Sequence, residues 1–232
     1  MTLQQLALDL PHRAAQGAED FLVSDCNLAA VKLLDAWPDW RAPVQLLLGP
    51  AASGKTHLVR VWQARSGARP ILSDALDVSA IDALDEGTAL IVEDADRGGY
   101  DENALFHLIN LAREKRLFVL MTARTAPSRW GCALPDLSSR LIALPVVEIG
   151  PPDDALLGQL VIKLLGDRGI AAPAELADYL VPRIERSYVS VLMVVDILDR
   201  VMLSHHRRMT VPLAKRALGE AGLIDRARKV IE

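Results

Sequence analysis

The sequence predicts an α/β protein in which a phosphate-loop core, built on a parallel five-stranded sheet flanked by helices, is followed by a small all-helical domain. Three observations support this prediction. Apolar, strand-like runs alternate with helical segments over residues 44–149, as in a parallel sheet. A glycine-rich loop follows the first of these runs. After Pro151 the sequence carries only helical patterns, which indicates a second domain.

The glycine-rich loop is the most specific motif of the chain. It reads GPAASGKT and lies between the apolar run Val44–Leu48 and a helical segment, which is the context that a phosphate loop requires and that argues against an ordinary glycine-rich turn. Glycines let the backbone wrap closely around phosphates, and N–H groups at a helix N-terminus attract the anion. Lys55 adds a positive charge, and Thr56 is expected to place its hydroxyl on Mg²⁺. The loop residues expected to bind the nucleotide are Gly49, Pro50, Ala51, Ala52, Ser53, Gly54, Lys55 and Thr56.

The remaining elements follow from apolar spacing and from turn residues. Ahead of the loop we expect a helix with Ser24 or Asp25 as its N-cap, ending before Pro38. Further strands are expected near Arg69–Leu72 and at Thr88–Val92, Leu117–Thr122 and Val146–Ile149. Helices are expected at Ser79–Leu84, after Asp101, and at Asp153–Asp167, Ala174–Arg183, Val189–His205 and Pro212–Ala221. The predicted organisation is a tail over residues 1–20, a nucleotide-binding domain over 21–150 and a helical domain over 151–232.

Composition and charge restrict the class of protein. The chain has 232 residues, of which 51% are hydrophobic and 24% are charged, and its formal net charge is −4. Such a chain is globular and has no basic surface for nucleic acid, so strong direct DNA binding is not expected. No membrane-spanning run or signal peptide is apparent, and two widely separated cysteines fit a reducing compartment. We therefore expect a cytoplasmic protein without a membrane partner.

Carboxylates follow the apolar run Thr88–Val92. Glu93 and Asp94 come directly after it, and in a doubly wound sheet this end of the strand faces the phosphate loop. A hydrolysed nucleotide needs a metal ligand and a group that positions water, so we assign Glu93 to Mg²⁺ and Asp94 to the water. Alternatively, the two acids only cap the following turn. Thr122, at the end of another strand, is a candidate polar sensor of the γ-phosphate.

Arg140 is a candidate catalytic residue that acts on a neighbouring molecule. It lies in LPDLSSRLIAL, between a helical segment and the last predicted strand. In nucleotide switches that work between subunits, such an arginine reaches the neighbour's γ-phosphate and accelerates hydrolysis by about 10³- to 10⁵-fold. An isolated arginine is more often a solvated surface charge, so both interpretations stay open at this point.

The N-terminal tail contains a short apolar peptide, QLALDL. Its leucines alternate, so that an extended chain presents them on one face. This pattern is typical of a peptide that fills a groove on a partner, although it also fits a peptide that packs on its own domain. The residues expected to bind the partner are Gln5, Leu6, Leu8 and Leu10.

Taken in order, the motifs resemble the DnaA-like family of AAA+ proteins, and within it the Hda branch, the regulatory inactivators of DnaA. FLVSDCNLAA is similar to the family's adenine-side motif, GPAASGKTHL to its Walker A, LIVEDAD to its Walker B, LMTAR to its sensor 1 strand and LSSRL to its arginine-finger motif. The resemblance covers nearly the whole chain. It implies an AAA+ core with a helical lid, and it adds Phe21, Leu22, Val23 and His57 to the nucleotide-binding residues.

The resemblance also implies a function. QLALDL is similar to the sliding-clamp-binding peptide of the Hda branch, and the chain stops after the lid, without the DNA-binding domain of the initiator. Such a protein binds ADP (or ATP) with Mg²⁺ and presents Arg140 to ATP held by DnaA, whose hydrolysis prevents over-initiation. The implied partners are the DNA polymerase sliding clamp and DnaA. A homo-oligomer, in the form of a dimer, is also expected, although the sequence does not decide the oligomeric state.

Three departures from the family pattern bear on hydrolysis. Glu93 stands where the initiators carry an aspartate, the sensor 1 strand runs into Arg124 without an acidic residue, and no arginine lies near Val189 or Ser190, the sensor 2 position. Arg186, one turn earlier, is a possible substitute. The missing sensors favour a weak intrinsic ATPase. The alternatives are an autonomous DnaA-like or helicase-loader ATPase, a regulator with a target other than DnaA, and a small-molecule kinase, which shares only the phosphate loop.

Overall fold

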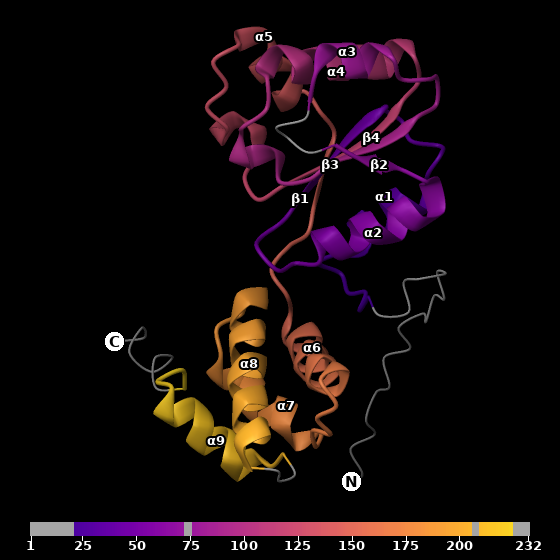
Figure 1. Cartoon of the computed structure of the whole chain (residues 1–232). Helices are drawn as coiled ribbons and strands as arrows, with labels where there is room; N and C mark the ends of the chain where they lie inside the picture. Colours follow the sequence, from indigo (N-terminus) through magenta and orange to yellow (C-terminus); the bar gives the residue numbers. More distant parts are fainter. Residues whose placement is uncertain (1–20, 72–75, 206–208, 225–232) are drawn as a thin grey trace, which may run out of the picture.

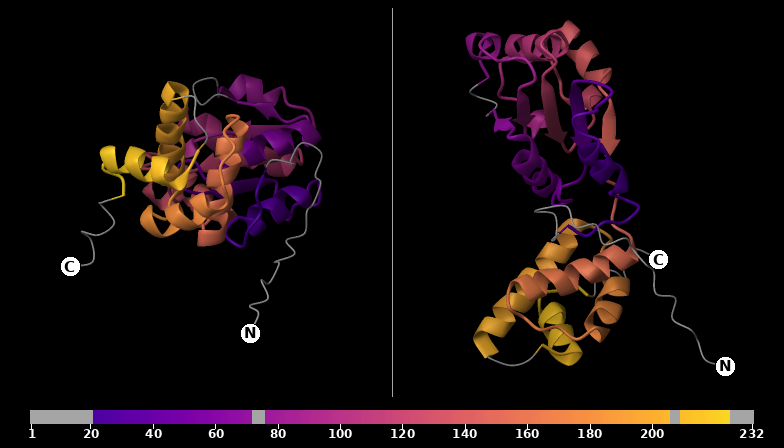
Figure 2. Two further views of the ribbon diagram at one scale, coloured as in Figure 1. Left: turned by 90° about the horizontal axis from the view of Figure 1, so that it is seen from below. Right: turned by 90° about the vertical axis from the view of Figure 1, so that its right-hand side faces the viewer.

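The computed structural model describes residues 21–71, 76–205 and 209–224. The predicted clamp-binding residues Gln5, Leu6, Leu8 and Leu10 lie outside these ranges. An α/β part and a helical part follow each other along the chain, and the segment after the last strand joins them (Figure 1). Seen from the side, the helical part lies below the α/β part and contacts it at one end (Figure 2).

The α/β part is built on a five-stranded parallel sheet, which confirms the predicted fold class. The strands lie in the order β2-β3-β4-β1-β5. Their bounds are Val44–Leu48 (β1), Arg69–Pro70 (β2), Ala89–Val92 (β3), Phe118–Ala123 (β4) and Val146–Glu148 (β5). In the register of the central pair, Leu48 is opposite Ala123. The loop after β1 therefore begins beside the end of β4.

Helices cover both faces of this sheet, and strand alternation decides which side chains meet which helices. Leu46, Leu90 and Met121 belong to a core cluster on one face, whereas Leu47, Ile91 and Leu120 belong to a cluster on the other. The first face is covered by α3 (Val78–Asp82), α4 (Glu102–Glu114) and α5 (Pro135–Ile142). The second face is covered by α1 (Leu28–Asp35) and α2 (Lys55–Ser66), on the side of the helical part (Figure 1).

Two local predictions in the α/β part need correction. The first helix begins at Leu28, and neither Ser24 nor Asp25 is its N-cap, because Asn27 precedes the helix. The Asn27 amide instead secures the segment before the helix, since its Oδ1 accepts from Ser24 N at 2.9 Å and its Nδ2 donates to Leu22 O at 2.9 Å. The strand expected near Arg69–Leu72 is assigned only over Arg69–Pro70 among the described residues.

The helical part has a core of its own. It consists of α6 (Asp154–Asp167), α7 (Glu175–Leu180), α8 (Tyr188–His205) and α9 (Val211–Glu220). Fully buried side chains from all four helices form one cluster, among them Leu157, Leu176, Val195 and Leu218. Leu156 and Tyr188 pack instead into the cluster with α1 and α2, so the helical part contacts the α/β part beside the phosphate loop. Within the described ranges, no helix is both long and apolar enough to cross a membrane.

Candidate nucleotide-binding site

The phosphate loop connects β1 to α2, and two of its positions require glycine. Gly54 has φ +90°, and a Cβ there would lie 2.7 Å from Cε2 of Phe21. A Cβ on Gly49 would lie 2.8 Å from Ser53 Oγ. Because α2 begins at Lys55, directly after Gly54, the loop ends on the N-terminus of a helix, where free N–H groups favour an anion.

Lys55 is folded into the loop. Its ammonium donates to Gly49 O at 2.7 Å and to Pro50 O at 2.9 Å, and the side chain is buried. Burial lowers the pKa of Lys55, and the nearby positive charge of Arg124 lowers the pKa of this amine further. A phosphate bound in the loop would replace these two neutral carbonyl acceptors with negatively charged oxygens, which bind the ammonium more strongly.

The two predicted metal ligands lie together. Thr56, at the start of α2, donates its hydroxyl to Glu93 Oε2 at 2.7 Å. A hydroxyl and a carboxylate at this spacing suit Mg²⁺, which usually takes one or two protein oxygens together with phosphate oxygens and water. No group of three or more His, Cys, Asp or Glu side chains in the described part of the chain is arranged to hold a metal ion. The fit to Mg²⁺ therefore depends on phosphate oxygens.

Asp94 and Thr122 are also neighbours, but their contact runs through the backbone. The Asp94 amide donates to Thr122 Oγ1 at 3.0 Å, and Asp94 itself has φ +51°. Thr122 Oγ1 acts as the acceptor in this bond, so its hydroxyl can still donate to another group. The residue is almost fully buried. The Asp94 carboxylate faces two arginines, with Arg97 Nη2 at 3.1 Å and Arg124 Nε at 3.9 Å.

Asp96 holds the end of β4, a role that sequence reasoning missed. Its Oδ2 accepts from the Arg124 amide at 3.0 Å, the Thr125 amide at 2.9 Å and the Thr125 hydroxyl at 3.0 Å. Asp96 lies on the short 3₁₀ helix η2 (Ala95–Arg97) that follows β3. In the sequence it appeared only as the third acid of the EDAD run, because the backbone groups that it binds lie 28 and 29 residues further along the chain.

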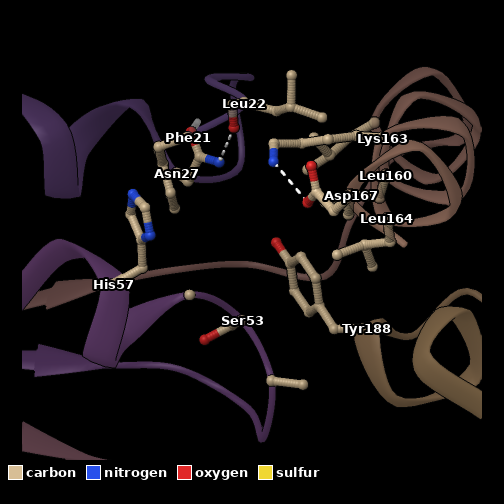
Figure 3. Close-up of a pocket in the computed structure, with 13 residues that line it drawn as sticks. Phe21, Leu22, Asn27, Ser53, His57, Leu160, Lys163, Leu164, Asp167 and Tyr188 are labelled. Carbon is tan, nitrogen blue, oxygen red and sulfur yellow. Dashed lines mark hydrogen bonds and ion pairs between the residues drawn. The ribbon is translucent and has the colours of Figure 1, made fainter. Parts of the chain in front are cut away.

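A pocket of about 320 Å³ lies between the phosphate loop and the helical part (Figure 3). One wall is formed by the Phe21 ring, which stacks on the His57 ring with centroids 5.5 Å apart and an interplanar angle of 19°. The opposite wall belongs to α6 and to Tyr188. The lining residues are Phe21, Leu22, Asn27, Ala52, Ser53, Gly54, His57, Leu156, Leu160, Lys163, Leu164, Asp167 and Tyr188.

Two buried polar atoms in this pocket lack protein partners. Ser53 Oγ and His57 Nε2 have no hydrogen bond among the described residues, although buried polar groups are nearly always paired. Across the pocket, Lys163 Nζ lies 2.8 Å from Asp167 Oδ2 on α6 (Figure 3). An apolar cleft with polar groups at two edges, next to an anion-binding loop, fits a phosphorylated ligand that has a flat ring.

The predicted nucleotide-binding residues divide between the pocket and the loop. Phe21, Leu22 and His57 line the pocket together with Ala52, Ser53 and Gly54, whereas Val23 does not. The residues of α6 and Tyr188 were missed. Leu156, Leu160, Lys163, Leu164 and Asp167 recur at helical spacing, but the same spacing is typical of an ordinary packed helix face.

Arg140 lies apart from this pocket. It occupies the last turn of α5, which covers the sheet face opposite α2 (Figure 1). Buried Leu137 and Leu141 anchor the helix, while Arg140 is exposed and forms no ion pair within the described residues. Arg186, the possible substitute in the helical part, pairs with Asp154 at 2.8 Å.

Comparisons with known proteins define the class of this fold. Domain III of the replication initiation protein DnaA from Thermotoga maritima superposes with a TM-score of 0.68 at 17% identity, covering 89% of this chain and 95% of that one. AMPPCP-bound DnaA from Aquifex aeolicus gives 0.66 at 17% identity, over 90% of this chain and 70% of that one. The RuvB Holliday junction branch migration motor from Thermotoga maritima gives 0.61 at 16% identity, over 84% and 66%. The fold of this chain is therefore similar to the folds of DnaA domain III and of the RuvB motor.

Sequence comparison narrows this class. Residues 163–218 match the family model described as the lid domain of Hda. An uncharacterized protein from Haemophilus influenzae is 26% identical over 192 residues, which span 78% of this chain and 83% of that protein. Residues 163–218 are thus similar to the Hda lid, and the fold of the chain is similar to that of DnaA domain III.

Proposed function

We propose that this protein binds an adenine nucleotide with Mg²⁺ and acts in trans as a regulator of replication initiation, by stimulating hydrolysis of ATP held by DnaA. The observation that carries the proposal is the position of Arg140, which is exposed and unpaired within the described residues and lies away from the chain's own nucleotide pocket. An arginine placed in this way is available to a second protein rather than to a nucleotide in the pocket of its own chain.

The nucleotide part of the proposal rests on the loop and the pocket. The phosphates bind the loop N–H groups and Lys55, while the base enters the pocket beside Phe21 and approaches the unpartnered atoms of Ser53 and His57. Thr56 and Glu93 hold Mg²⁺, which neutralises phosphate charge when it is bound. The likeness to a DnaA structure with bound AMPPCP supports an adenine nucleotide.

The surface around Arg140 suits a protein partner. Ile142 is 57% exposed and Val146 is 44% exposed, so apolar side chains follow the arginine on α5 and β5. An arginine beside exposed apolar groups is typical of interface centres. The match to the Hda lid supports DnaA as the partner. Recruitment by the sliding clamp, through Gln5, Leu6, Leu8 and Leu10, rests on the sequence alone.

The decisive assay follows hydrolysis of DnaA-bound ATP in the presence of the full chain and clamp-loaded DNA. We expect stimulation that Arg140→Ala abolishes, with ADP binding to the variant unchanged, because Arg140 lies apart from the pocket. Arg129→Ala is the matched control, since it removes another exposed arginine next to α5. Deleting residues 1–10 should abolish the clamp-dependent stimulation without loss of ADP binding. Absence of stimulation, or full stimulation by the Arg140→Ala variant, would refute the proposal.

A second candidate is an autonomous ATPase of the DnaA-like or helicase-loader type. The geometry that favours it is the metal side of the site, where Thr56 contacts Glu93 and the Asp94 amide contacts Thr122. This candidate predicts multiple turnovers of MgATP by the isolated chain. A turnover rate that Glu93→Gln abolishes and that DnaA does not change would favour the autonomous enzyme over the regulator.

A further inference from the structure

Arg124 stands where β4 meets the phosphate loop. β4 ends at Ala123, which lies opposite Leu48 in the sheet, and the Gly49 amide donates to Ala123 O at 3.1 Å. The residue after β4 therefore begins beside the first glycine of the loop. This position follows from the strand order, because β1 lies between β4 and β5.

The backbone of Arg124 is secured while its side chain keeps room to move. The Asp96 carboxylate accepts from the Arg124 amide at 3.0 Å, whereas the Arg124 side chain is 44% exposed. Its Nε lies 3.9 Å from Asp94 Oδ1, which is beyond hydrogen-bond range. The guanidinium is therefore held near the Walker B acids by charge, without a close bidentate contact to them.

Arg124 and Lys55 place two positive charges around the same loop. Lys55 Nζ donates to Gly49 O at 2.7 Å, and the Gly49 amide donates to the carbonyl of Ala123, the residue before Arg124, at 3.1 Å. An anion bound in the loop near these residues would attract both cations. The nearby Asp94 carboxylate compensates Arg124 in part, but it is also paired with Arg97 at 3.1 Å.

No arginine of the helical part is among the described residues that line the pocket beside the loop. The first turn of α8 carries Val189 and Ser190, and Arg186 pairs with Asp154 at 2.8 Å. A terminal phosphate that extends past Lys55 toward the strand ends would instead meet Arg124 and the acids after β3. An arginine suits this contact because its planar guanidinium offers two parallel donors to phosphate oxygens.

From this arrangement we infer that Arg124 binds the terminal phosphate of a nucleoside triphosphate in the chain's own site and so distinguishes it from a diphosphate. The inference rests on the proposed nucleotide binding. A γ-phosphate competes with Asp94 for Arg124, and the Asp94 carboxylate is thereby released from one of its two cations. Arg124 is thus a binding residue whose loss changes the preference between triphosphate and diphosphate.

The test measures the affinities of the full chain for MgADP and MgAMPPCP by calorimetry. AMPPCP carries a terminal phosphate and is not hydrolysed at the β–γ bridge, so binding is separated from turnover. In Arg124→Ala, the affinity for AMPPCP should fall about 10- to 100-fold, as expected for a lost charge-assisted hydrogen bond, while the affinity for ADP stays nearly unchanged. Arg124→Lys keeps the positive charge but lacks the two parallel N–H donors of the guanidinium, so it should recover part of the lost affinity for AMPPCP.

Arg113→Ala is the control, because Arg113 is another exposed arginine that lies on α4, away from the loop and from Asp94. It should leave the ratio of the two affinities unchanged. An unchanged ratio in Arg124→Ala, or an equal change in Arg113→Ala, overturns the inference and leaves the proposed nucleotide site intact. If the wild-type chain binds neither nucleotide, the proposed function and the inference fall together. Arg124→Gln, which keeps the length of the side chain, replaces the alanine variant should that variant fail to fold.

Discussion

Thr56 Oγ1 donates a hydrogen bond of 2.7 Å to Glu93 Oε2, across 37 residues of sequence. The contact joins the start of α2 to the end of β3, so the sheet brings the hydroxyl of the phosphate loop to an acid on a strand that is separated from β1 by β4. Thr56 and Glu93 therefore mark the place where Mg²⁺ would bind beside the phosphates.

Glu93→Gln should remove most of the contribution of Mg²⁺ to nucleotide affinity. The amide keeps the shape of the side chain but carries no negative charge, and the expected loss of Mg²⁺ enhancement is roughly tenfold or more. AMPPCP titrations with and without Mg²⁺ measure this enhancement. Asp85→Asn removes an exposed carboxylate beyond α3 and should leave it unchanged. An unaltered Mg²⁺ response in Glu93→Gln would exclude Glu93 as a metal-side ligand.

Gly54→Ala should destabilise the fold and weaken nucleotide binding. The positive φ of +90° costs a residue with a Cβ about 1–2 kcal/mol, and the new methyl group would also displace the Phe21 ring. Gly67→Ala is the matched control, since Gly67 has φ +67° but open space around its Cβ position. Urea unfolding should show the larger loss in Gly54→Ala, together with a lower affinity for ADP. Equal losses in the two variants would show that the Phe21 contact contributes nothing.

Asp96→Ala should loosen the end of β4 and reduce the preference for a triphosphate. Three donors converge on Oδ2 of the half-buried Asp96, and we expect a loss of about 1–2 kcal/mol in the free energy of unfolding. Asp101→Ala removes a carboxylate that accepts from two amides at the start of α4, so it has a comparable cost without contact to the site. Only Asp96→Ala should change the ratio of AMPPCP to ADP affinity.

Stability should fall as the pH rises above 10. Burial raises the pKa of Tyr188 and of Tyr100 well above their ordinary value of 10.0, so both stay protonated in the folded chain while they ionise in the unfolded one. Each such group contributes stability fully below pH 10 and loses about 1.4 kcal/mol per pH unit above it, until the pH passes its folded pKa. Urea unfolding between pH 8 and pH 11 measures this slope.

Tyr188→Phe should flatten the alkaline slope. Near neutral pH the same variant should be less stable by about 1 kcal/mol, because the hydroxyl donates to Gly150 O at 3.2 Å and contacts Cys26 Sγ at 3.3 Å. Tyr100→Phe should also flatten the slope, since the pKa of Tyr100 is raised for the same main reason. An alkaline slope that is the same in both variants as in the wild type would contradict the assignment.

The fold class and the phosphate loop could be predicted from the sequence because their signals are local. GPAASGKT needs particular residues at particular spacings, and strands buried on both faces, such as Ala89–Val92, appear as continuous apolar runs. The N-cap prediction failed because Ser24, Asp25 and Asn27 are all acceptable cap residues by type. The choice depended on the contacts of Asn27 with Leu22 and Ser24.

The sequence by itself determined the class of this protein: a parallel α/β core with a phosphate loop, an acid pair after a buried strand, and helices beyond residue 150. Tertiary structure decided which distant groups share the site. Asp96 holds the amide of Arg124, Lys163 and Asp167 face His57 across the pocket, and Arg140 lies on the other side of the sheet. The physical reason is that local spacing encodes strands and helices, whereas the partner of a side chain depends on strand order and on how the helical part docks.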